Sequence, residues 1–174
     1  ALNASVELPD LAIAPVYRSD GSGTNFLFTT FLSNADADFK AKIGANASVQ
    51  WPAGIGAKGN EGVANMVKQT QGAIGYVEYA YVKQNKMAYA SLVNDAGKTV
   101  SPTAESFQAA AANADWSSAP GMYLVVTNQP GDRSWPITGA SFILMPKEPK
   151  DAAAAKTALA FFDWAYAKGS AMAD

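Results

Sequence analysis

Tyr17-Arg18-Ser19-Asp20-Gly21-Ser22-Gly23-Thr24 joins a mostly apolar segment, residues 11–16, to an apolar run at residues 25–32. The first segment is typical of a strand and the run is typical of a helix that extends from about residue 24 to residue 33. Ser22 and Thr24 belong to the residue types that cap helices, and Gly21 and Gly23 allow a tight turn and the close approach of a ligand. The stretch therefore predicts a strand, a loop and a helix in direct succession.

The polar groups of this loop favour an oxyanion as its ligand. The first turn of a helix has unpaired N–H groups and a partial positive charge, and both stabilise an anion. Arg18 adds a planar set of donors that suits an oxyanion, and it is one of only two arginines in the chain, with Arg133. The alternative is an ordinary turn and helix cap, because clusters of Ser, Asp and Gly also mark loops that bind nothing.

The composition limits the other possibilities. The chain has 174 residues, of which 49% are apolar and 16% charged, and this is typical of one compact globular domain. A net charge of −2 gives no support for nucleic-acid binding. The chain has no cysteine and no histidine, which excludes disulfides, thiolate or histidine metal sites and nucleophiles that depend on histidine.

Further strands and helices are expected to alternate along the chain. Strands are expected at residues 72–77, 89–93, 99–100, 123–127 and 140–145. Helices are expected after Asn60 as a cap, at residues 78–85, at residues 101–114 with Ser101 as the cap and Pro102 at the first position, and at residues 151–168. This alternation predicts an α/β layered domain, in which ligands bind beyond the carboxyl ends of the strands. The loop at residues 18–24 occupies such a position.

Several motifs together resemble one family along nearly the whole chain. They are Arg18-x-Asp20-Gly21-Ser22-Gly23-Thr24-x-Phe26-x-Phe28-Thr29, Trp51-Pro52 with Gly54-Ile55-Gly56-x-Lys58-Gly59-Asn60-x-Gly62, residues 72–81 (GAIGYVEYAY), Trp135-Pro136-Ile137-Thr138, Phe142-Ile143-Leu144 and residues 161–166 (FFDWAY). The chain thereby resembles the periplasmic phosphate-binding proteins that serve phosphate ABC transporters.

This resemblance implies a fold and a set of partners. The expected fold is a lobe of the type II periplasmic-binding-protein kind, α/β in class, with a central mixed β-sheet flanked by helices over residues 1–174. Members of the family have two lobes that close around the ligand, so the other lobe is expected to lie outside this sequence. The implied partners are inorganic phosphate, that second lobe and the membrane permease. The implied location is periplasmic or otherwise extracytoplasmic, and neither a cofactor nor a metal is implied.

The resemblance also assigns roles to residues of the loop. Arg18 would pair with the phosphate, and Asp20 would hold the guanidinium of Arg18 in place. Ser22 and Thr24 would give hydroxyl and backbone N–H bonds, and Gly23 would give a backbone N–H. Two other functions stay open at this point: a phosphatase-type enzyme that uses the same loop, and a scaffold lobe that binds nothing.

Overall fold

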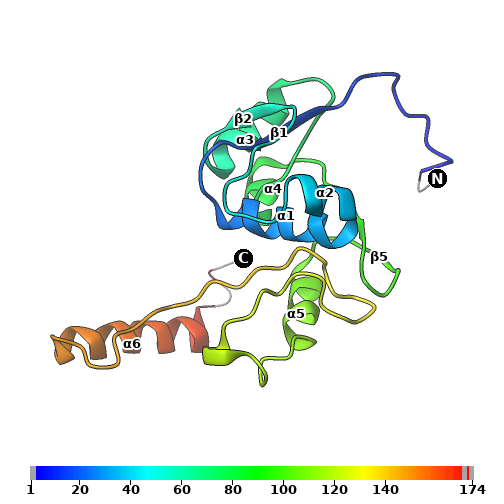
Figure 1. The fold of residues 1–174 in the computed structure, drawn as a ribbon. Coiled ribbons are helices and arrows are strands. Elements are labelled where there is room, and N and C mark those ends of the chain that lie inside the picture. Colours follow the sequence, from blue (N-terminus) through cyan, green and yellow to red (C-terminus); the bar gives the residue numbers. More distant parts are fainter. Residues whose placement is uncertain (1–2, 170–171, 173–174) are drawn as a thin grey trace. The chain divides into compact units, whose positions relative to one another are not determined.

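The computed structural model describes residues 3–169 and Met172. The chain divides into two compact units, Ala1–Ala140 and Ser141–Asp174, and each is described by itself (Figure 1). In chain order the elements are β1 (Ala14–Arg18), α1 (Gly23–Ala35), α2 (Ala37–Lys42), β2 (Ile55–Ala57), α3 (Gly59–Gln69), β3 (Ala73–Gly75), α4 (Tyr79–Asn85), β4 (Leu92–Val93), β5 (Thr99–Val100), α5 (Ala104–Ala112), the short 3-10 helix η1 (Pro120–Met122) and α6 (Ala152–Lys168).

The sheet of the first unit is parallel and has β1 at its centre. The strand order is β2-β1-β3, and Val16 pairs with Ile55 on one side and with Gly75 on the other. The α/β class is confirmed, but the sheet is parallel where a mixed sheet was expected. The antiparallel pair, β4 with β5, forms a separate two-stranded sheet. Because all three parallel strands run the same way, their carboxyl ends meet at one edge.

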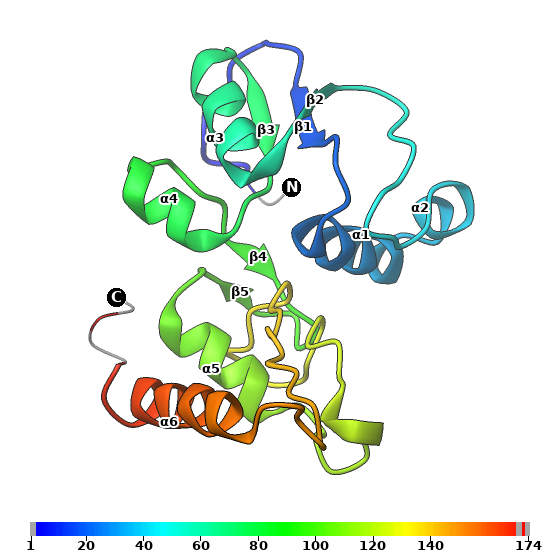
Figure 2. The same ribbon diagram turned by 90° about the vertical axis from the view of Figure 1, so that its left-hand side faces the viewer.

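Helix α3 packs on this sheet and contacts all three of its strands (Figure 2). Val63 of α3 is fully buried against Val16 and Ala57. A Cβ at Gly75 would lie 2.7 Å from Cγ2 of Val67 and 3.0 Å from Cγ1 of Val63, so only glycine lets the helix come this close to β3. This packing fixes the carboxyl edge of the sheet relative to the start of α3.

A second apolar cluster lies in the later part of the first unit. It consists of Ala110, Ala114 and Val126, with Trp116 and Leu124 packed against it. The strands expected at residues 123–127 and 140–145 are wrong, because neither segment forms a strand. Residues 123–127 contribute one isolated bridge, from Thr127 to Ile137. Apolar and β-branched residues form a strand only where a neighbouring segment pairs with them.

Two helix starts also differ from the expectation. Helix α5 begins at Ala104 with Thr103 as its cap, and not at Ser101. Helix α3 begins at Gly59 with Lys58 at the cap position, so Asn60 lies inside the helix. The start of α1 at Gly23 and the span of α6 agree closely with the expectation.

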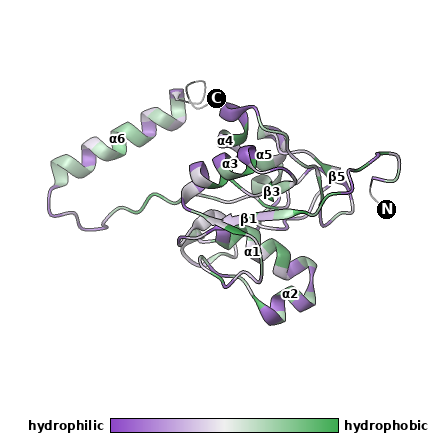
Figure 3. Ribbon diagram, turned by 90° about the horizontal axis from the view of Figure 1, so that it is seen from above, coloured by the Kyte–Doolittle hydropathy of each residue, from purple (hydrophilic) through white to green (hydrophobic). Residues whose placement is uncertain are grey.

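In the second unit, α6 follows Asp151, whose side chain accepts a hydrogen bond from the N–H of Ala154. The helix ends at Lys168, and Gly169 is its C-cap. Hydrophobic and hydrophilic residues alternate along this helix (Figure 3).

Candidate functional site

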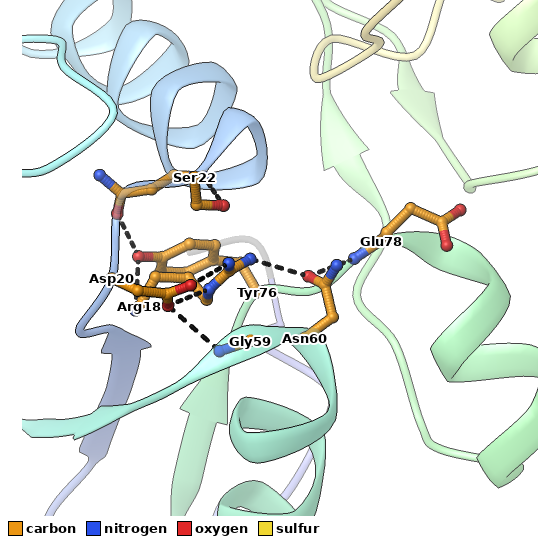
Figure 4. Close-up of polar contacts among 8 residues, drawn as sticks. Arg18, Asp20, Ser22, Gly59, Asn60, Tyr76 and Glu78 are labelled. Carbon is orange, nitrogen blue, oxygen red and sulfur yellow. Dashed lines mark hydrogen bonds and ion pairs between the residues drawn. The ribbon is translucent and has the colours of Figure 1, made fainter. Parts of the chain in front are cut away.

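The carboxyl ends of the three parallel strands bring three loops together (Figure 4). β1 ends at Arg18 and leads to α1, β2 ends at Ala57 and leads to α3, and β3 ends at Gly75 and leads to α4. The predicted anion loop is the first of the three. Polar side chains and backbone groups from the other two loops contact it.

Arg18 and Asp20 form a two-pronged ion pair. Nε of Arg18 donates to Oδ1 of Asp20 and Nη2 donates to Oδ2, each over 2.8 Å. The Arg18 side chain is only 9% exposed. A guanidinium so far removed from water is stable only when it is paired and hydrogen-bonded. The hydrogen bond to Arg18 and then that from the Gly59 N–H hold the pKa of Asp20 well below its usual range. The hydrogen bond to Asp20 likewise raises the pKa of Arg18.

Asp20 also binds the start of α3. Its Oδ1 accepts the backbone N–H of Gly59 at 3.1 Å, so the carboxylate takes the place of a side-chain cap, which Lys58 does not supply. Nη1 of Arg18 donates to Oδ1 of Asn60 over 3.4 Å. The anion loop is therefore connected to the first turn of α3 through both members of the ion pair.

The start of α1 has two backbone donors that remain open. Oγ of Ser22 accepts the N–H of Asn25 at 3.2 Å, and the N–H of Ser22 itself donates to the carbonyl of Ala47 over 2.9 Å. Within the part of the chain that the structure describes, the N–H groups of Gly23 and Thr24 have no acceptor. Ser22 therefore acts as a helix cap, and Gly23 and Thr24 provide the free donors.

Gly21 and Gly23 are glycines for which the fold gives no reason. Neither has a positive φ, and a Cβ at either position would meet no atom within 4 Å. Neither position therefore requires glycine for its backbone conformation. Open space next to the free N–H of Gly23 lets a ligand approach the backbone closely.

The charges at the helix starts set α1 apart. Among the α-helices of the described residues, α1 is the one with no carboxylate at its cap or in its first turn. The others have Asp36 and Asp38 (α2), Glu61 (α3), Glu78 (α4), Glu105 (α5) and Asp151 (α6). A carboxylate there offsets the positive end of the helix dipole. At α1 this positive end has no such partner.

A hydrogen-bonded network that the sequence reasoning missed lies beneath the loop. The hydroxyl of Tyr76 accepts the backbone N–H of Arg18 at 3.0 Å and donates to Oδ1 of Asn25. Nδ2 of Asn25, which is fully buried, donates to the carbonyl of Asn46 over 2.9 Å. The position of Tyr76 directly after a strand, at the same sheet edge as Arg18, is the signal that could have found it.

Other kinds of site receive no support. Residues 3–169 and Met172 contain no group of three or more acidic side chains that could hold a metal ion. None of the helices within that range is both long enough and apolar enough to cross a membrane.

The chain is similar in sequence to several known proteins. The chain is 55% identical over 172 residues to the phosphate-binding protein PstS of Xylella fastidiosa (strain Temecula1), and the alignment covers 99% of the chain and 47% of that relative. It is 54% identical to PstS of Pasteurella multocida, covering 99% of the chain and 50% of the relative. It is 37% identical to PstS of Methanocaldococcus jannaschii, and this alignment covers 80% of the chain and 39% of the relative. The chain therefore spans about half the length of the first two of these curated relatives.

A family model for the PBP superfamily domain matches residues 3–168. Because this match extends over nearly the whole sequence, the chain belongs to the PBP superfamily.

Proposed function

We propose that this chain supplies one half of a phosphate-binding cleft that serves uptake by an ABC transporter. The observation that carries the proposal is the loop from β1 to α1, where Arg18 is anchored by Asp20 and leads to a helix start at which no carboxylate compensates the helix dipole. The names of the relatives, phosphate-binding protein PstS, support phosphate as the anion.

The donors fit a tetrahedral oxyanion. An arginine side chain has five N–H groups, and Arg18 uses three of them on Asp20 and Asn60. The remaining two, with the N–H groups of Gly23 and Thr24 and the hydroxyls of Ser22 and Thr24, would bind the anion. Phosphate has many lone pairs and must lose its water to enter a cleft, so it requires a dense and fixed set of donors. Asp20 would act on the anion only through Arg18.

The half of the cleft that this chain would supply offers hydrogen-bond donors to the anion and no free acceptor for its proton. The Asp20 carboxylate is already bound to Arg18 and to the N–H of Gly59, so it is not available to accept a proton from the ligand. We propose that discrimination between phosphate and sulfate depends on a second lobe, present in the remaining half of a full-length protein. The membrane permease would be the partner of the complete protein, and its location would be extracytoplasmic.

Binding without chemistry fits the site better than catalysis does. The Oγ of Ser22 accepts the N–H of Asn25, and no basic side chain among the described residues contacts this hydroxyl to activate it. A phosphatase-type reaction would therefore lack an activated nucleophile. A scaffold lobe that binds nothing would give no reason for the missing carboxylate at the start of α1 or for the open space at Gly23.

The test is a titration of the chain with phosphate at constant ionic strength, followed by calorimetry and by NMR, with sulfate as the competitor. We expect weak saturable binding, with a Kd on the order of 1 mM, that sulfate displaces. Arg18→Ala should abolish it. Arg133→Ala is the matched control, because it removes the other, exposed arginine and should leave binding unchanged.

Three results would contradict the proposal. No saturable binding by the unaltered chain, or equal binding by Arg18→Ala, would remove the loop as the phosphate site. Micromolar binding that sulfate cannot displace would show that the chain alone contains a complete, selective cleft. Release of phosphate from a phosphomonoester, with or without divalent metal ions, would support the enzymatic alternative.

A further inference from the structure

We infer that Tyr76 is a positioning residue for the anion loop, and that its hydroxyl sets the geometry of the phosphate donors without touching the anion. This inference rests on the proposed function. It follows from the two hydrogen bonds of a single hydroxyl, one to the last residue of β1 and one to the first turn of α1.

The direction of each hydrogen bond is fixed by chemistry. Nδ2 of Asn25 donates to the carbonyl of Asn46, so Oδ1 of Asn25 faces Tyr76 and can only accept. The Tyr76 hydroxyl must therefore donate to Asn25, and its lone pair accepts the N–H of Arg18. The hydroxyl therefore both donates and accepts a hydrogen bond, and its two partners, Arg18 and Asn25, lie at opposite ends of the loop.

The two residues that the Tyr76 hydroxyl binds lie at the two ends of the segment that contains all the proposed phosphate donors. Arg18 begins the loop, and Asn25 is the residue whose N–H is capped by Ser22. Ser22, Gly23 and Thr24 lie between them. One hydroxyl thus fixes the separation between the guanidinium-bearing residue and the open helix start, which is the separation that an anion bridging the two must match.

The ring of Tyr76 is held independently of its hydroxyl. It stacks on Phe28 of α1 with ring centroids 4.2 Å apart and an interplanar angle of 18°. Burial raises the pKa of Tyr76, so its hydroxyl is protonated and able to donate at neutral pH. The phenylalanine variant can therefore keep the ring in place while it removes only the hydrogen bonds.

The test compares Tyr76→Phe with Tyr17→Phe. Tyr17 is also a stacked aromatic residue, 5.7 Å from Trp51 between ring centroids, and its hydroxyl has no hydrogen-bond partner in the described part of the chain. Tyr76→Phe leaves a buried acceptor on Asn25 unpaired and should weaken phosphate binding about tenfold. Tyr17→Phe should leave the affinity unchanged.

A second measurement, without phosphate, separates positioning from general destabilisation. In NMR spectra and amide hydrogen exchange, Tyr76→Phe should shift the amide signals of residues 18–25 and speed their exchange, while those of Thr103 and Ser106 at the start of α5 stay unchanged. A merely structural role would speed exchange at both places.

The outcomes are distinguishable. Equal affinities for the two variants, with unchanged amide signals at residues 18–25, would overturn the inference. Uniformly faster exchange would overturn it as well. If the unaltered chain binds no phosphate, the proposed function fails, and the amide signals then decide whether the Tyr76 hydroxyl holds the loop.

Discussion

Helices α1 and α5 begin with similar caps, Ser22 and Thr103, and differ in the charge of their first turns. At α5, Oγ1 of Thr103 accepts the N–H of Ser106, Oγ of Ser106 accepts the N–H of Thr103, and Glu105 lies in the first turn. At α1, Oγ of Ser22 likewise accepts the N–H of Asn25, but the first turn has no acidic residue. Among the described residues, both caps leave the N–H groups of the first two helical residues open, so the starts differ in charge: α5 has a carboxylate in its first turn, and α1 has none.

This difference is what distinguishes the phosphate site that we propose at α1 from an ordinary helix cap. Ser and Thr at a cap are common to both starts and indicate only a helix. The distinguishing features of α1 are the missing carboxylate, the anchored arginine in the loop before it and the glycines that leave open space. Each of these can be changed singly, so the comparison can be tested one feature at a time.

The largest effect is expected when α1 is given the carboxylate that it lacks. Thr24→Asp places an acid in the first turn, where it should stabilise the helix by about 0.3–1 kcal/mol and repel an anion. Phosphate binding should fall by about a hundredfold or more, beyond detection in an NMR titration, while the midpoint of thermal unfolding does not drop. The reciprocal control, Glu105→Thr, should create no phosphate binding at α5. Unchanged affinity in Thr24→Asp would show that the α1 start is not the seat of the anion.

The next effect tests the open space at Gly23. Gly23→Ala should weaken phosphate binding about tenfold, because the new methyl group stands where the anion approaches the backbone. The free energy of unfolding should stay the same or rise by up to about 1 kcal/mol, since alanine restricts the unfolded chain. Gly62→Ala in α3 is the matched control: its Cβ would make ordinary contacts at 3.6 Å with Ala57, and it should not alter affinity. A stable Gly23→Ala variant that binds phosphate normally would contradict a ligand at this position.

The smallest effect is expected for the anchor of Arg18. Asp20→Asn should lower affinity several-fold, because a neutral amide orients the guanidinium less firmly. The change should also alter the response to acid. The lowered pKa of Asp20 means that its ion pair stabilises the folded state above about pH 4 and that this contribution is lost as the pH falls further. The midpoints of thermal unfolding of the two proteins should therefore differ at pH 7 and converge toward pH 2. If the two midpoints differ by the same amount from pH 7 to pH 2, the ion pair of Asp20 does not contribute to the loss of stability in acid.

The sequence predicted the parts of the fold that depend on local patterns. The β1-loop-α1 unit and the span of α6 follow from apolar runs bounded by caps and glycines. The strands expected at residues 123–127 and 140–145 did not form, because strand formation depends on a partner that a local pattern does not reveal. The start of α5 was displaced by two residues because Thr103 and Ser106 close a reciprocal pair of hydrogen bonds that Ser101 cannot make.

The sequence allowed the ion pair of the candidate site to be predicted, but not the contacts that hold the loop from other parts of the chain. Arg18 and Asp20 are two residues apart, so their contact could be proposed from the sequence, and the structure shows it. The contacts from Gly59, Asn60 and Tyr76 come from residues 39 to 58 positions away along the chain. They arise because parallel strands bring their carboxyl ends together, a result of strand order that motif spacing alone does not give. The direct contacts of Ser22, Gly23 and Thr24 with phosphate remain a prediction.

We propose that phosphate binds at the start of α1 and not at the equally well-capped start of α5. The most direct measurement is an NMR titration of the assigned chain with phosphate at constant ionic strength, recording the backbone amides of both helix starts. Under this proposal, we expect saturable shifts at Gly23 and Thr24 and none at Ala104 and Glu105. Equal shifts at both starts, or shifts confined to α5, would contradict it.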